Sequence, residues 1–236
     1  MIGGGTKKSS INKLIDTLLN QGVIRSHKVS QVMRKVDRAD FCPGHYCYED
    51  SPQPINYNAT ISAPHMHAYV LEWLKDVLVP GGNALDVGSG SGYLCAAFYE
   101  MMDNQGYVVG IDHIDGLVHQ SVLNLKKSYQ KELDEQRIVM LTGDGRLGCP
   151  EYAPYNAIHV GAASPEIPQA LIEQLAPGGK MIIPVGPPDN QHIVLASKDN
   201  YGKVHANKLI GVRYIPLTSK EKQCPDLQIP EYYQNQ

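Results

Sequence analysis

The stretch "NALDVGSGSGYLCAAFYEMM", Asn83–Met102, decides the fold. Its first half is a short apolar run that ends in the loop "GSGSG", 88–92, and its second half continues as an apolar helical pattern. The stretch therefore predicts a strand, a glycine turn and a helix. Glycines in such a turn let the backbone approach a ligand closely, and the helix N-terminus favours negative charge. A dinucleotide-binding loop would read G-x-G-x-x-G; here the third glycine comes one residue early, so the loop alone also fits a turn without a ligand.

Strand and helix patterns alternate on the carboxyl side of this turn. The expected strands lie at 106–112, 137–145, 155–163 and 180–186, and the expected helices at 116–133 and 165–179. Two later runs, 192–199 and 208–217, are typical of closing strands that form an antiparallel pair. The alternation predicts an α/β fold with a doubly wound, mostly parallel sheet.

The amino-terminal side of the turn has a different pattern. Apolar residues at helical spacing predict a helix over 11–19 and a shorter one over 29–36, and 41–58 is typical of a loop. A third helix is expected from about Pro64. We expect one domain, 1–236, with an N-terminal helical and loop region at 1–79, an α/β core at 80–223 and a polar tail at 224–236.

Composition narrows the class of protein. The chain has 21 Lys and Arg against 24 Asp and Glu, a net charge of −3, and no long basic run, which disfavours a protein that binds duplex nucleic acid. No segment has the length of a membrane span. The five cysteines are scattered without a C-x-x-C pair, which is typical of lone thiols in a reducing cytosol and disfavours a metal site.

Three acids end successive predicted strands: Asp86, Asp112 and Asp144. In a doubly wound sheet such strand ends line one crevice, where ligands bind. Asp112 follows the glycine loop by twenty residues, as expected for a carboxylate that accepts ribose hydroxyls. Asp144, flanked by glycines, is placed to accept from an adenine amine. A single strand-end Asp is more often a cap or turn former, but three together favour an adenosine-containing ligand.

Several segments resemble those of one enzyme family. The motifs are "ALDVGSGSG", "VVGIDHI", "GDGR", "YNAIHVGAA" and "LAPGGKMIIPVG", together with "ATISAPHMHAYVLEWL". They resemble the protein-L-isoaspartate (D-aspartate) O-methyltransferases, which belong to the S-adenosylmethionine-dependent methyltransferases with a Rossmann-like fold. The resemblance covers roughly Ser9 to Gln223, and the upstream segment carries most of its specificity because many methyltransferases share the glycine loop.

The resemblance implies a cofactor, a substrate and a set of contacts. The cofactor would be S-adenosyl-L-methionine, with S-adenosyl-L-homocysteine as product, and the substrates would be peptides and proteins with damaged isoaspartyl or D-aspartyl residues. By the same resemblance, the cofactor-binding residues would be Ala59, Thr60, Ile61, Ser62, His67, Asp86, Gly88, Ser91, Asp112, His113, Asp144, Gly145, Thr218 and Gln223. We expect a monomer.

Ser62 is the candidate catalytic residue. A carboxylate is ionised at neutral pH and is already a nucleophile, so the implied reaction needs alignment more than a general base. Ser62 precedes Ala63 and Pro64 at the start of a helix, where it is expected to act as an N-cap. A capping hydroxyl keeps its proton, which it can donate to a substrate carboxylate.

The two histidines of this segment differ in helical phase. His67 shares a face with Val70, Leu71 and Leu74, and we expect that face to point inward, toward the ligand or the core. His65 is expected near Glu72 on the outer side. A metal pair is disfavoured because two ligands on one helix need i, i+4 spacing.

Three further positions carry weaker expectations. His159 and Gly161 follow a predicted strand near the crevice, where packing and substrate contact are both open. Arg38, after the second helix, is expected to pair with an acid rather than to act in catalysis.

Other functions remain open on sequence alone. They are methyl transfer to another carboxylate, a non-catalytic binder of an adenosyl ligand, and a nicotinamide dehydrogenase. The short glycine spacing disfavours the dehydrogenase, and the intact segment 58–67 disfavours a loss of transfer.

Overall fold

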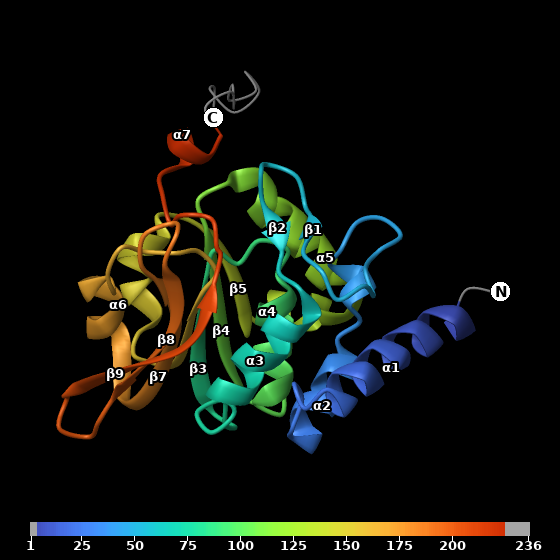
Figure 1. The fold of residues 1–236 in the computed structure, drawn as a ribbon, viewed down its shortest axis with the longest axis horizontal. Helices are drawn as coiled ribbons and strands as arrows, with labels where there is room; N and C mark the ends of the chain where they lie inside the picture. The colour runs from blue at the N-terminus through green and yellow to red at the C-terminus, as the bar shows by residue number, and fades with distance from the viewer. Residues whose placement is uncertain (1–3, 225–236) are drawn as a thin grey trace.

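A seven-stranded sheet forms the centre of the molecule (Figure 1). The computed structural model describes residues 4–224, of which 4–9 by their backbone alone. The strand order is β5-β4-β3-β6-β7-β8-β9. The strands are β3 (Gly82–Val87), β4 (Gly106–Asp112), β5 (Ile138–Thr142), β6 (Tyr155–Val160), β7 (Leu175–Val185), β8 (Gln191–Lys198) and β9 (Val204–Val212). Strands β3 to β7 pair in parallel, and β7–β8 and β8–β9 pair antiparallel, which confirms the predicted doubly wound sheet and its closing pair.

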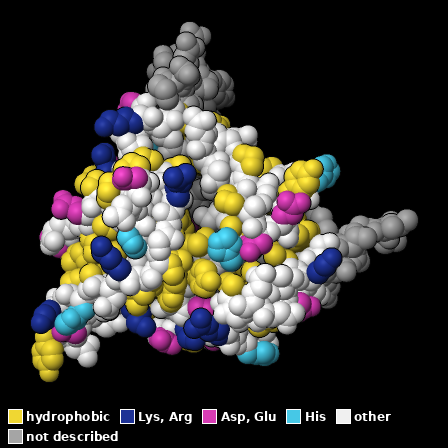
Figure 2. Space-filling model, viewed as in Figure 1, with side chains coloured by type: hydrophobic (Ala, Val, Ile, Leu, Met, Phe, Trp, Pro, Cys, Tyr) yellow, Lys and Arg dark blue, Asp and Glu magenta, His cyan; other side chains and the backbone are white. Residues whose placement is uncertain are grey.

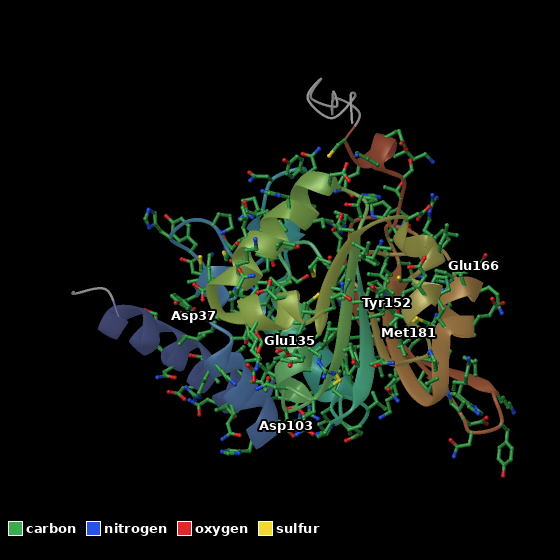
Figure 3. The ribbon with its side chains drawn as sticks, turned by 180° about the vertical axis from the view of Figure 1, so that it is seen from behind. Asp37, Asp103, Glu135, Tyr152, Glu166 and Met181 are labelled. Carbon is green, nitrogen blue, oxygen red and sulfur yellow. The ribbon has the colours of Figure 1, made fainter. Side chains whose placement is uncertain are left out.

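The helices cover the two faces of the sheet unequally. On one face lie α1 (Gly4–Asn20), α2 (His27–Lys35), α3 (Pro64–Leu74), α4 (Tyr93–Met101) and α5 (Asp115–Asp134), which share one apolar cluster with Ala84, Val108 and Ala157 of the sheet. On the other face, α6 (Gln169–Gln174) packs on alternate residues such as Leu85 and Val109. Viewed from behind, Tyr152 and Met181 lie on the α6 side, and Asp37 and Asp103 on the side of the other helices (Figure 3). Burial of both faces explains the near-continuous apolar strands of the sequence.

The glycine turn has the conformation that its residues allow. Gly88, Gly90 and Gly92 all have positive φ, and Gly92, at +83°, is the residue that precedes α4. The backbone N–H groups of Gly88 and Ser89 donate to the carbonyl of Ile111 on β4, so the turn is fastened to the neighbouring strand. Since only glycine adopts these angles without strain, the loop "GSGSG" sets the direction in which α4 leaves β3.

One predicted helix is much shorter than expected. The pattern at 165–179 predicts a helix of that length, but α6 spans Gln169–Gln174 and β7 begins at Leu175. Pro168 immediately precedes the helix, and Pro177 and Gly178 cannot continue it. The backbone instead pairs Leu175 with Tyr155 and then shifts register. The prediction of helix over 175–179 was wrong because strand pairing took those residues.

The amino-terminal region is close to its predicted form. Helix α1 begins earlier than expected, and α2 agrees with the predicted position. The predicted loop contains a short helical turn, Arg38–Asp40, and strand β1 (Gln53–Pro54), which pairs with β2 (Thr60–Ile61). Short helical turns also follow β5 at Gly145–Leu147 and precede β6 at Pro150–Tyr152, and α7 (Lys220–Gln223) ends the described chain.

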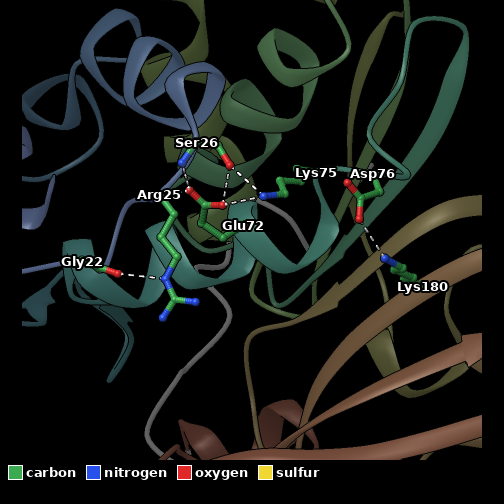
Figure 4. Close-up of polar contacts among 7 residues, drawn as sticks. All are labelled: Gly22, Arg25, Ser26, Glu72, Lys75, Asp76 and Lys180. Atoms are coloured by element: carbon green, nitrogen blue, oxygen red, sulfur yellow. Dashed lines mark hydrogen bonds and ion pairs between the residues drawn. The ribbon is translucent and has the colours of Figure 1, made fainter.

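Glu72 fastens α3 to the segment before α2 (Figure 4). Its carboxylate accepts hydrogen bonds from the backbone N–H groups of Arg25 (2.7 Å) and Ser26 (2.6 Å), from the Ser26 hydroxyl (2.6 Å) and from Lys75 (3.1 Å). Burial would raise the pKa of Glu72, but these donors lower it overall. The N-terminal region is thus anchored along the outer side of α3, which holds that helix against the sheet.

The structure contains no helix, within residues 4–224, that is long and apolar enough to cross a membrane.

Candidate active site

A crevice opens at the carboxyl ends of β3, β4 and β6. We call it the glycine-loop crevice. Its lining residues come from these strand ends, from the start of α5, from the turn after β5, from β2 and the residue before it, and from the C-terminal segment 215–223. They are Ala59, Thr60, Val87, Gly88, Gly90, Ile111, Asp112, His113, Leu117, Gly145, Gly161, Ala162, Ile215, Pro216, Leu217, Thr218 and Gln223. This is the edge of a doubly wound sheet at which ligands bind.

Asp112 organises the crevice. One carboxylate oxygen accepts from the backbone N–H of Gly90 at 3.1 Å, and the other accepts from the N–H of Ile114 at 3.0 Å. Burial raises the pKa of Asp112, and the two N–H donors oppose that rise. Each oxygen keeps a further lone pair, so Asp112 can hold the glycine loop and still accept from a ligand.

The C-terminal segment closes one side of the crevice. The Gln223 side chain lies 2.8 Å from His113 Nε2 through its Oε1 atom and donates to the carbonyl of Tyr57 at 3.2 Å. Lys220 pairs with Asp115 at the start of α5 at 2.8 Å. The side chain of Asn58 donates back to the carbonyl of Gln223 at 3.2 Å. These contacts join segments more than one hundred residues apart around the crevice.

The structure brings eight of the residues implied by resemblance into this lining: Ala59, Thr60, Gly88, Asp112, His113, Gly145, Thr218 and Gln223. The other six lie elsewhere; Ser62 and His67 are described below. Ile61 is buried, Ser91 lines a neighbouring cavity with Phe41 and Asn124, and Asp86 and Asp144 have partners of their own.

The prediction that three strand-end acids line one crevice is only partly met. Asp86 is buried and pairs with Nδ1 of His159 at 2.7 Å, and the Cys95 thiol donates to it at 3.6 Å. The side chain of Asp144 forms a bidentate pair with Arg146, which lowers its pKa, and it caps the helical turn 145–147. Of the three, only Asp112 belongs to the lining. Asp86 pairs in register with Gly110, two residues before Asp112, so it lies deeper in the sheet, and Asp144 lies in the turn after β5.

A second hollow adjoins the crevice, and we call it the α3 cavity. It has a volume of about 500 Å³ and is lined by the start of α3, by β9 and by the residues after β9: Pro52, Thr60, Ser62, Ala63, His65, Met66, Tyr69, Gly161, Ile210, Gly211, Val212, Arg213, Tyr214 and Ile215. Thr60, Gly161 and Ile215 line both hollows, so the two meet there. Figure 2 shows this face, with a hydrophobic floor hollowed between the β9 side and the α3 side.

Ser62 lies in the α3 cavity but does not cap the helix. Ala63 occupies the N-cap position and no side chain caps α3 through it, so the N-cap prediction for Ser62 was wrong. Ser62 instead faces Tyr214 across the cavity: burial raises the pKa of Tyr214, and the Ser62 side chain acts in the opposite direction. The helix start is served by Asp50, which accepts from the backbone N–H of His65 at 2.9 Å.

The two histidines lie on different sides of α3, with His67 inward as predicted and His65 at the α3 cavity. His65 lines the α3 cavity, with its ring Nδ1 2.8 Å from Asp50. His67 is buried, stacked on Tyr93 with ring centroids 4.5 Å apart, and is absent from the lining of both hollows. Burial, and next the charge of Arg38, hold the pKa of His67 well below its usual value. The apolar face of α3 does point inward, but it faces the core, and the cavity lies on the other side.

Arg38 is buried without the expected acidic partner. Its Nη1 atom lies 3.3 Å from Nδ1 of His67, while Nε and Nη2 have no hydrogen-bond partner among the described residues. Burial lowers its pKa. His159, also buried, is a packing residue paired to Asp86, whereas Gly161 lines both hollows.

Sequence reasoning missed Tyr214 and Arg213. Both stand in the segment "VRYIPL", but nothing in their spacing shows that the end of an edge strand turns toward α3. A polar and a charged residue amid an apolar edge strand were the available signal.

Comparison with known proteins gives one consistent result. The family model described as protein-L-isoaspartate (D-aspartate) O-methyltransferase matches residues 9–222. A wheat (Triticum aestivum) protein-L-isoaspartate O-methyltransferase is 52% identical over 91% of this chain and 94% of its own, and one from Caenorhabditis elegans is 47% identical over 91% and 95%. A crystal structure of a Plasmodium falciparum protein of the same description, in complex with S-adenosyl-L-homocysteine, aligns with a TM-score of 0.82 and 33% identity over 90% of this chain and 98% of that one.

Proposed function

The chain belongs to the protein-L-isoaspartate (D-aspartate) O-methyltransferase family, and from that premise we propose how its residues divide the work. The enzyme transfers a methyl group from S-adenosylmethionine to the free carboxylate of an isoaspartyl residue. The observation that carries our assignment is the meeting of two hollows at Thr60, Gly161 and Ile215: one is built for a nucleoside, and the other presents a hydroxyl pair.

The residues of the glycine-loop crevice fit an adenosyl cofactor. Asp112 offers two carboxylate oxygens with free lone pairs, which suits two ribose hydroxyls. Gly145 lets the turn after β5 pack closely against the end of β3, because a Cβ atom there would lie 2.4 Å from the side chain of Val87. We propose that the eight lining residues named above bind the cofactor, and that Asp86 acts beneath them by fixing His159 and the end of β6. When bound, the cofactor supplies an activated methyl group on a sulfonium.

The residues of the α3 cavity then orient the substrate. A carboxylate at neutral pH needs no base to attack, so the protein contributes position and hydrogen bonding. We place the isoaspartyl carboxylate where the two hollows meet, beside Ser62. The Ser62 hydroxyl would donate its proton to the carboxylate, while the neighbouring Tyr214 hydroxyl donates to the Ser62 oxygen.

The start of α3 contributes less than a free helix terminus would. Asp50 already accepts the backbone N–H of His65 and contacts its ring. The partial positive charge at the N-terminus of α3 is therefore already compensated in large part by the carboxylate of Asp50. This leaves the Ser62 hydroxyl, oriented by Tyr214, as the donor that faces the substrate carboxylate.

Paired peptides test the function. The protein is incubated with labelled S-adenosylmethionine and two peptides that differ only in Asp against isoAsp. Base-labile label on the isoAsp peptide alone is the expected result. Equal label on both would indicate a methyltransferase for other carboxylates, and label on neither, with S-adenosylhomocysteine still bound, would indicate a non-catalytic binder.

We further propose that the enzyme acts as a monomer in a reducing cytosol. All five cysteines are free thiols, which suits such a compartment. Sedimentation of the purified protein tests the first proposal, and fractionation of the cells that make it tests the second.

A further inference from the structure

Arg213 is an unpaired cation at the α3 cavity. It follows the last residue of β9, is exposed, and lines the cavity together with Ser62 and His65. Within residues 10–224 it takes part in no hydrogen bond, ion pair or cation–π contact. Some basic side chains elsewhere on the surface have partners, as Lys28 has in Asp103 and Lys220 in Asp115. What distinguishes Arg213 from other cations without a partner among the described residues, such as Lys208, is its place in the cavity lining. The positive charge of Arg213 is therefore available to whatever enters the cavity.

The other lining groups do not neutralise this charge. Ser62 and Tyr214 are uncharged hydroxyl groups, and His65 is engaged by Asp50, which lies outside the lining. Arg213 carries the one permanent full charge in the lining. The cavity is thus polarised toward an anion on the β9 side.

Arg213 stands away from the meeting point of the two hollows. Ile215 lies at that point, and two residues of chain span at most about 7 Å. A substrate peptide in extended form advances about 3.3 Å per residue, so two of its residues span about the same distance as Arg213 to Ile215. The guanidinium of Arg213, which lines the α3 cavity but not the glycine-loop crevice, is therefore within reach of a side chain one or two residues from the residue at the meeting point.

We propose that Arg213 is a specificity-determining residue: it favours isoaspartyl substrates with an acidic side chain one or two residues from the isoaspartyl residue. This inference rests on the proposed placement of the isoaspartyl carboxylate at the meeting point. It adds a charge preference to an enzyme whose chemistry otherwise needs only the isomerised backbone and its carboxylate.

The effect is modest in size. Exposed ion pairs contribute about 0.2–1 kcal/mol, and the upper end corresponds to about a fivefold change in affinity. The preference should appear in KM, because the ion pair forms on binding and does not change during transfer. It should shrink at high salt, where exposed charges are screened.

The test uses two series of isoaspartyl hexapeptides. One series carries Glu, Gln or Lys at the two positions before the isoaspartyl residue, and the other at the two positions after it. In at least one series we expect a KM about three- to fivefold lower for the Glu peptide than for the Gln peptide, with similar kcat. Arg213→Gln should make KM similar for the Glu and Gln peptides. Arg213→Glu should make KM lowest for the Lys peptide.

Lys208→Gln is the matched control. Lys208 is an exposed cation on β9 that does not line the cavity, and its replacement removes the same charge. The Glu-to-Gln ratio should persist in this variant. The inference is overturned if neither series shows the ratio in the unaltered enzyme, if Arg213→Gln retains it, or if Arg213→Gln lowers kcat for Glu and Gln peptides alike. Failure of the function itself differs, since isoaspartyl peptides would then take no label at all.

Discussion

The glycine-loop crevice and the α3 cavity meet at three residues but are built in different ways. The crevice is assembled from the ends of adjacent parallel strands, and Asp112 holds its loop through backbone N–H groups. The α3 cavity joins side chains from distant segments, with Ser62 on one wall and Tyr214 on the other. The first depends on backbone geometry that the sheet imposes, and the second on side-chain pairs across the fold.

This difference suggests a division of labour. A crevice that rests on strand ends suits a cofactor of constant shape. A cavity that rests on side chains from α3 and β9 can be tuned for substrate without disturbing the sheet. Substitutions in one hollow should therefore change cofactor binding, and substitutions in the other should change turnover or the choice of peptide.

The largest effect is expected from Asp112→Ala. The change removes the carboxylate from the crevice and leaves the N–H groups of Gly90 and Ile114 unpaired. Hydrogen bonds to charged groups contribute about 1.5–3 kcal/mol, so we expect S-adenosylhomocysteine to bind about 10- to 100-fold more weakly by calorimetry. Asp103→Ala, at an exposed pair with Lys28, is the control and should leave binding unchanged. Unchanged binding in Asp112→Ala would show that the crevice is not the cofactor site.

Acid should weaken the fold beneath α3 through His67. Its pKa is held below the unfolded value near 6.5 by burial and by Arg38, so below pH 6.5 the unfolded chain binds a proton that the folded protein does not. Stability that is fully present above pH 6.5 is then lost as the pH falls, by up to about 1.4 kcal/mol per pH unit. Urea unfolding between pH 7 and 5 should show a shallower decline for His67→Gln than for the unaltered protein.

His205→Gln provides the comparison for that experiment. His205 is an exposed residue beside Asp199 near the β8–β9 turn, so the same change of residue is made away from the core. The free energy of unfolding of His205→Gln should fall between pH 7 and 5 as steeply as that of the unaltered protein. Parallel curves for His67→Gln as well would mean that His67 titrates alike in both states.

A smaller effect is expected where the C-terminal segment closes the crevice. Gln223→Ala removes the contacts with His113 and with the carbonyl of Tyr57. A net hydrogen bond contributes about 0.5–1.5 kcal/mol, so S-adenosylhomocysteine should bind about 3- to 10-fold more weakly. Lys222→Ala, an exposed neighbour, should bind as before. If both variants bind S-adenosylhomocysteine as tightly as the unaltered protein, the C-terminal segment does not contribute to cofactor binding.

More of the glycine-loop crevice than of the α3 cavity could be predicted from the sequence. Residues at parallel strand ends share one edge of a sheet, so Gly88, Asp112 and Gly145 could be placed together from pattern alone. Which acid faces the ligand could not be predicted, because Asp86 and Asp144 form pairs with His159 and Arg146. Those partners become visible only when the strands are packed.

The α3 cavity shows the limit of helical phase. The sequence predicts that His67 lies on the inward face of α3, and the structure confirms this. On that face the ring of His67 stacks on the aromatic ring of Tyr93. The cavity side of the helix is defined by β9, whose turn toward α3 carries no sequence signal. The predicted helix over 165–179 was too long for a related reason. Some of its residues have a helical pattern but pair with β6 as part of a strand.

Ser62→Ala is the most direct test of the division of labour, with two quantities measured on the same preparation. The dissociation constant for S-adenosylhomocysteine, measured by calorimetry, reports on the crevice, and kcat for an isoaspartyl peptide reports on the cavity. Loss of a donor that aligns the carboxylate should lower kcat about 10-fold or more while cofactor binding changes less than about twofold. An unchanged kcat, or a weakening of cofactor binding equal to the loss of turnover, would contradict the account.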